Sequence, residues 1–165
     1  MNTDNLYLLN HNLGQNNFKP EFYWTGDLEK DAVLINEPHI KAEGKQEDRI
    51  DETLEIITMY QTKFEYIEEE LTFDARDIFN IQNHYLKRNN YKGIVPGLRL
   101  HDVTFENSLH YPLVPTLFHE ILPVNLTSKE DLLLWYTVMQ KIHPLSDLNG
   151  RVFGTIVALL YQPKK

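Results

Sequence analysis

At 165 residues, with 42% hydrophobic side chains, the chain is large enough to bury one hydrophobic core. It contains no cysteine, which excludes disulfides and thiolate metal sites, and a cytoplasmic location is the simplest expectation. The net charge of -8 argues against nucleic acid as the main partner, and no apolar run is long enough to predict a membrane span.

The first half of the chain is predicted to hold an arm and then three helices. The first twenty residues are rich in asparagine and show no period, so residues 1–32 are interpreted as a loosely ordered arm and residues 33–165 as the folded domain. A short helix is predicted over about 37–44, where Gly44 would end it. Apolar residues at spacings of three, four and seven predict a long amphipathic helix over 49–71, and Asp74 is the expected N-cap of the next.

The second half combines an irregular segment with apolar helices. Glycines, prolines and alternating residues over about 93–113 predict a β-hairpin. A short helix, "TLFHEIL", should end at Pro123. Ser128 resembles an N-cap for the helix "KEDLLLWYTVMQKI", and a last apolar helix follows Gly150. The predicted fold class is therefore all-α with one small hairpin.

A polar cluster interrupts the last two helices in the stretch "KIHPLSDLNGR". It lies at a helix N-terminus, where free amides and the helix dipole favour an anion, and Asn149 and Gly150 suit a tight backbone that points amides inward. Arg151 in a first helical turn is best explained by a bound anion. Asp147 could hold Mg²⁺ against phosphates, and His143 has the side chain best suited to a general base near neutral pH. These are the parts of a phosphate-transfer site.

The polar residues have two other interpretations. In the first, His143 and Asp147 cap helices and Arg151 is an ordinary surface residue. In the second, the histidines at 101, 110 and 119 bind zinc, but "HEILP" lacks the second histidine of a metalloprotease helix and contains a proline. Scattered surface histidines explain that set more simply.

The order of residues in "HPLSDLNGR" resembles the signature of the Fic family (filamentation induced by cAMP), His-Pro-Phe-x-Asp/Glu-Gly-Asn-Gly-Arg. The segment "PGLRLHDVTFENSLHYPLVPTLFHEIL" is similar to the family's hairpin flap and following helix. The segment "EPHIKAEG" is similar to its inhibitory helix, with Glu43 as the inhibitory acid. The resemblance covers roughly residues 33–161.

The resemblance implies a helical Fic-type fold and an adenylyltransferase that moves AMP from ATP to a Ser, Thr or Tyr hydroxyl of a target protein. His143 would take the proton from that hydroxyl, and Asp147 would hold Mg²⁺. The phosphates would be bound by Leu148, Asn149, Gly150 and Arg151. The flap would dock the target by strand addition. The oligomeric state is left open.

Three positions depart from the family pattern. Leu145 replaces the usual Phe, Leu148 replaces a Gly or Ala, and Gly154 stands where many members carry a second arginine. If position 148 needs a positive φ, leucine there costs about 1–2 kcal/mol. The chain also stops at "YQPKK", where the family usually continues, which predicts a degenerate or truncated member. The alternative function is therefore a catalytically inactive Fic-like module that binds a nucleotide or a protein.

Overall fold

The computed structural model describes residues 2–14, 20–43, 47–64, 71–88, 93–103 and 109–161. These residues form seven α-helices and a short 3-10 turn, and there is no β-strand among them. The all-α prediction is confirmed to that extent. In the same part of the chain no helix is both long and apolar enough to cross a membrane. The helices are α1 (Thr3–Asn12), α2 (Leu28–Glu43), α3 (Glu47–Phe64), α4 (Ala75–Arg88), α5 (Val114–Glu120), α6 (Lys129–Ile142) and α7 (Asn149–Leu160), and the turn is η1 (Tyr111–Leu113).

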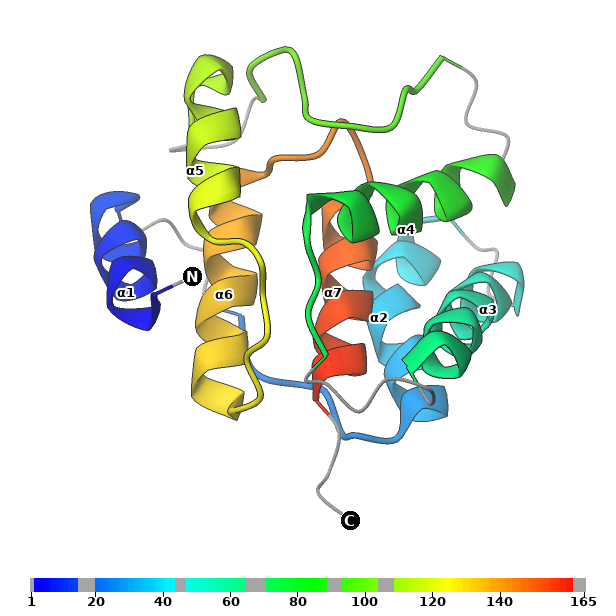
Figure 1. Ribbon diagram of the computed structural model, residues 1–165. Coiled ribbons are helices and arrows are strands. Elements are labelled where there is room, and N and C mark those ends of the chain that lie inside the picture. Colours follow the sequence, from blue (N-terminus) through cyan, green and yellow to red (C-terminus); the bar gives the residue numbers. More distant parts are fainter. Residues whose placement is uncertain are drawn as a thin grey trace.

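Helix α7 is the centre of the bundle. It packs against α2, α3, α4 and α6, which surround it in Figure 1. Every residue from Arg151 to Leu160 is buried, as expected for a helix that is apolar on all sides. The polar residues of the stretch before it must therefore be satisfied inside the protein or by a ligand.

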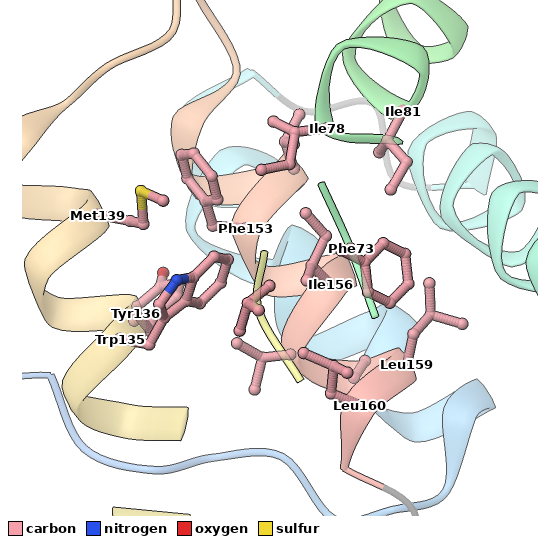
Figure 2. Close-up of a cluster of buried hydrophobic side chains, with 14 of the residues drawn as sticks. Phe73, Ile78, Ile81, Trp135, Tyr136, Met139, Phe153, Ile156, Leu159 and Leu160 are labelled. Atoms are coloured by element: carbon pink, nitrogen blue, oxygen red, sulfur yellow. The ribbon is translucent and has the colours of Figure 1, made fainter. Parts of the chain in front are cut away.

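The core joins α6 and α7 through aromatic and aliphatic side chains (Figure 2). The rings of Trp135 and Phe153 meet edge to face, with centroids 5.6 Å apart. The Trp135 indole N–H donates to the carbonyl of Ile121 at 3.3 Å, so its polar atom is satisfied. Beside α7, the backbones of Phe73 and Val124 exchange two hydrogen bonds of 2.9 Å, which fixes the two segments that precede α4 and α6.

Helix boundaries follow the predicted capping chemistry. Asp74 and Asp77 cap α4 reciprocally, each side chain accepting from the other's amide at 3.0–3.1 Å. Ser128 Oγ accepts from the Asp131 amide at 3.2 Å and starts α6. The helix predicted over 49–71 is α3, and its predicted last turns fall on residues 65–70, outside the described residues.

The N-terminal region differs from the loosely ordered arm predicted for residues 1–32. Helix α1 packs on α6 and buries Leu6 completely. Lys141 Nζ of α6 donates to Asn10 Oδ1 at 2.8 Å and to the carbonyl of Gly14 at 3.1 Å. Helix α2 begins at Leu28, well before the predicted 37–44. The prediction of a loosely ordered arm does not match α1. One buried leucine and a few long-range hydrogen bonds hold this helix, and such contacts leave no clear period in a sequence.

The hairpin predicted over about 93–113 is not confirmed. Among residues 93–103 and 109–113, the extended backbone pairs at only one point, an isolated antiparallel bridge between Leu98 and Leu145. Its partner is thus the loop before α7, and Figure 1 shows the two segments passing each other at one end of the bundle. Residues 104–108 lie outside the described residues.

The docking of α1 gives the first prediction. Leu6→Ala should lower the free energy of unfolding by about 2 kcal/mol or more, because it leaves a cavity between α1 and α6. Leu8→Ala is the matched control, since that leucine is 59% exposed and its loss should change the stability by less than about 0.5 kcal/mol. Urea denaturation measures both, and equal stabilities would show that α1 contributes nothing to the fold.

Candidate functional site

The loop of residues 143–148 is bounded by two left-handed residues. His143 ends α6 with φ 49° and ψ 58°, and Leu148 precedes α7 with φ 71° and ψ 24°. They are the only non-glycine residues with positive φ in the part of the chain that the structure describes. A leucine in this conformation is strained, so neighbouring contacts must hold the loop in place. The predicted condition that position 148 needs a positive φ is met.

Asn149 closes the loop from inside. Its Oδ1 accepts from the amide of Leu145 at 2.9 Å, and its Nδ2 donates to the carbonyl of the same residue at 3.1 Å. Gln140 Nε2 donates to the carbonyl of Asn149 at 3.2 Å. Asn149 is 3% exposed and Leu145 is 1% exposed. The Asn149 side chain therefore shapes the loop, and it is the backbone amides nearby that remain for a ligand.

Gln82 of α4 holds the loop from a second side. Its Nε2 donates to Ser146 Oγ at 2.9 Å and to the carbonyl of Asp147 at 3.1 Å, while its Oε1 accepts from the amide of Gly97 at 2.8 Å. The sequence pattern does not single out Gln82 directly. Its position four residues after Ile78, on the apolar face of an amphipathic helix, could have indicated a buried polar side chain, and Gln82 is fully buried.

Segment 93–103 holds the loop from a third side. The Arg99 amide donates to the carbonyl of Pro144, and the Ser146 amide to that of Gly97, both at 2.9 Å. Within the described part of the chain, the Arg99 guanidinium then donates only to main-chain carbonyls: from Nε to His143 at 2.7 Å, from Nη1 to His101 at 2.9 Å, and from Nη2 to Ile142 and Leu109. In the sequence, Arg99 stands out only as part of the segment that resembles the Fic flap.

His143 is a neutral imidazole at neutral pH. Burial and the positive charge of Arg99 lower the pKa of His143 to about 4, and the nearby carboxylate of Asp147 opposes them only in part. An imidazole that is unprotonated at pH 7 can accept a proton, as a general base must. Its left-handed backbone and the carbonyl bond to Arg99 fix where the side chain leaves the chain.

Asp147 lies between the predicted base and the start of α7. Its Oδ1 accepts from the Leu148 amide at 2.7 Å, and its side chain is half-buried. The described residues contain no group of three side chains that could hold a metal ion by themselves. Mg²⁺ commonly uses one or two carboxylates together with substrate phosphates, so this single carboxylate fits Mg²⁺ carried by a nucleotide.

The N-terminus of α7 offers free amides. The first backbone bond of the helix runs from the Val152 amide to the carbonyl of Leu148 at 2.9 Å. Among the described residues, the amides of Asn149, Gly150 and Arg151 donate no hydrogen bond. Three unpaired N–H groups at the positive end of a helix dipole form an arrangement that binds anions.

The side chain of Arg151 does not lie in the environment predicted for it. Its side chain is fully buried, with Nε donating to Asn36 Oδ1 at 2.8 Å and Nη2 to Glu52 Oε2 at 2.9 Å. The guanidinium also lies 4.2 Å from the centre of the Tyr85 ring. It ties α7 to α2, α3 and α4, and neither the phosphate-holding role nor the surface interpretation matches this environment. Nη1 is buried without a hydrogen-bond partner.

Two other positions that depart from the family pattern, 148 and 154, lie in the packed core. Leu148 is 7% exposed and packs in the core, so its side chain does not crowd an open phosphate site. Gly154 is covered by the segment before α2 and by α2 itself. A Cβ at Gly154 would lie 3.1 Å from the Tyr23 hydroxyl and 3.4 Å from Ile35, and the Trp24 indole donates to the Gly154 carbonyl at 2.9 Å.

The predicted inhibitory helix is the last part of α2. Ile35 lies against Gly154 and Asn36 against Arg151, so α2 and α7 run antiparallel and the C-terminal end of α2 approaches the loop end of α7 (Figure 1). Glu43 is the last residue of α2, but its side chain lies outside the described residues.

The histidines weighed as zinc ligands do not gather. His110 Nδ1 pairs with Asp102 at 2.9 Å on the exposed surface. His119 lies on α5, and no metal-binding group includes it in the described part of the chain. The side chains of His101, His110 and His119 are all exposed.

Comparison with known proteins adds no relative: no family model, curated protein or solved structure matches the chain.

Asn149 provides a test of the loop. Asn149→Ala should lower the free energy of unfolding by about 2–4 kcal/mol, because both backbone groups of Leu145 would lose their partners in a buried place. Asn80→Ala, on the exposed face of α4, is the control and should change the stability by less than about 0.5 kcal/mol. Thermal and urea unfolding measure the difference. A loss as small as that of the control would mean that Asn149 does not close the loop.

Gly154 provides a test of the packing that replaces the second arginine. Gly154→Arg should cost about 3 kcal/mol or more, because the space is filled and a buried charge would lack a partner. In Gly154→Ala, the gain in helix propensity offsets the 3.1 Å contact with Tyr23, so the change should stay within about 1 kcal/mol. Urea denaturation distinguishes them, and an arginine variant as stable as the alanine variant would contradict this packing.

Proposed function

We propose that this chain is a Fic-like adenylyltransferase that moves AMP from ATP to a Ser, Thr or Tyr hydroxyl of another protein. The observation that carries the proposal is the loop of residues 143–148. It joins a neutral imidazole, a half-buried carboxylate and the free amides of α7, in the order of the family's signature. Each of these groups suits one requirement of phosphate transfer.

In this proposal the amides of Asn149, Gly150 and Arg151 bind the phosphates of ATP. Asp147 holds Mg²⁺, which when bound neutralises phosphate charge. His143 accepts the proton of the target hydroxyl while that oxygen forms a bond to the α-phosphorus of ATP. The bond from the α-phosphorus to the bridging oxygen breaks, and pyrophosphate leaves with the electron pair. The Arg151 side chain takes no part, because the core binds it.

Segment 93–113 would dock the target as the flap of a Fic-like fold. Its described residues lie beside the loop that carries His143, through the bridge between Leu98 and Leu145. Val95 is 75% exposed and Leu100 is 83% exposed, which is the exposure expected of apolar side chains that meet a partner. Glu43 at the end of α2 is proposed to inhibit the reaction from the loop end of α7.

A second candidate function is an inactive Fic-like module that binds a nucleotide or a protein. It is favoured by the environments of Arg151 and Gly154. In the described structure, the one arginine of the motif is held by Asn36 and Glu52, and the place of the second arginine is filled by core atoms. A nucleotide would then be held through amides and Mg²⁺, with weaker control of its outer phosphates.

Two measurements test the proposal. Calorimetry with ATP and Mg²⁺ should detect binding, and labelled AMP should be transferred to the chain itself or to lysate proteins. His143→Ala should abolish transfer and change the nucleotide dissociation constant by less than about twofold, since the base acts on the hydroxyl. The control is His119→Ala, an exposed histidine on α5, which should keep full activity.

Three outcomes decide between the candidate functions. Binding without transfer by the wild-type chain favours the inactive module. No binding of ATP, CTP, GTP or UTP contradicts a nucleotide site at α7. Equal transfer by His143→Ala and wild-type protein removes His143 from the mechanism.

A further inference from the structure

We propose that Arg99 is the positioning residue of this site. Its side chain fixes the main chain at His143 and ties the proposed docking segment, residues 93–113, to that main chain. The inference rests on the proposed function for its catalytic consequence. Its structural basis is independent of that function, because among the described residues the hydrogen bonds of the guanidinium all go to main-chain carbonyls.

Two of the four hydrogen bonds of the Arg99 guanidinium lie at the end of α6. Nε of Arg99 donates to the carbonyl of His143 at 2.7 Å and Nη2 to that of Ile142 at 3.1 Å. Carbonyls at a helix C-terminus lack donors within the helix and carry its negative partial charge, so a cation there forms strong hydrogen bonds. Because one of these carbonyls belongs to His143 itself, Arg99 acts directly on the peptide that carries the imidazole.

The other two hydrogen bonds go to the proposed docking segment. Nη1 of Arg99 donates to the carbonyl of His101 and Nη2 to that of Leu109. These two carbonyls stand on either side of residues 102–108. Asp102 also accepts from the Tyr111 amide at 2.9 Å. A single planar side chain therefore joins His101 and Leu109 to the end of α6.

The shape of the guanidinium matters as well as its charge. It has five donors in a fixed fork, and here four carbonyls from three places in the backbone accept from them: the adjacent pair of Ile142 and His143, then His101 and Leu109. A lysine ammonium has three donors on a flexible stem and cannot reach all four in one geometry. Arg99 is 2% exposed, so water cannot readily take over the lost contacts.

The charge of Arg99 acts on His143 in the same direction as burial. Both disfavour the imidazolium, and Asp147 on the loop is the opposing charge. Arg99 thus holds the backbone of His143 in its left-handed conformation and adds to the burial that keeps the side chain in the form that accepts a proton. A residue with a merely structural role would not affect the second property.

The test compares Arg99→Lys, which keeps the charge, with Arg99→Gln, which loses it. Arg76→Gln, an exposed arginine on α4, is the control. Nuclear magnetic resonance follows the titration of the His143 ring, assigned with His143→Ala among the seven histidines. The pKa of His143 should stay near that of the wild type in Arg99→Lys and rise in Arg99→Gln, which removes the charge that adds to burial. In both variants kcat for transfer should fall at least tenfold, while KM for the nucleotide changes by less than about twofold.

Each outcome bears on the proposal. If Arg99→Gln fails to fold, Arg99→Lys decides, and a folded lysine variant with the kcat of wild type overturns the positioning role. A His143 pKa in folded Arg99→Gln equal to that of wild type overturns the electrostatic part. If the wild-type chain transfers nothing, the proposed function fails, but the ring titration still shows whether Arg99 acts on His143.

Discussion

The turn between α6 and α7 is the constraint on which the rest of the structure depends. It reverses the chain through two left-handed residues, His143 and Leu148, which are unfavourable unless other contacts hold them. Asn149 holds it from within, Gln82 from α4 and Arg99 from the neighbouring segment. Apart from the bond of Gln82 to Ser146 Oγ, these contacts reach main-chain atoms of the loop, so its shape depends little on most of its side chains.

The sequence predicts well the elements whose stabilisation is local. Helices α6 and α7 follow from apolar residues and from the capping pair of Ser128 and Asp131, and the loop between them follows as their interruption. It predicts poorly what long-range contacts decide. Arg151 looks like an anion ligand in the sequence, but its partner Glu52 lies 99 residues away and turns the side chain into the core. Helix α1 was missed for the same reason.

The environment of Arg151 changes the character of the anion site. The buried Arg151 of α7 bonds to Asn36 of α2 and Glu52 of α3, and these bonds offset the cost of removing its charge from water. In the proposed reaction the phosphates would meet neutral amides and Mg²⁺ in place of a guanidinium. Such a site depends more on the divalent cation than one that has its own arginine.

The two tryptophans give the molecule a built-in optical property. Trp135 packs on Phe153, and Trp24 donates to the carbonyl of the next residue, Gly154, so both indoles touch the same turn of α7. Both are at least 97% shielded from water, an environment that gives short-wavelength emission. Their fluorescence therefore reports whether the central helix is enclosed. The emission would therefore shift when the core around α7 opens on unfolding.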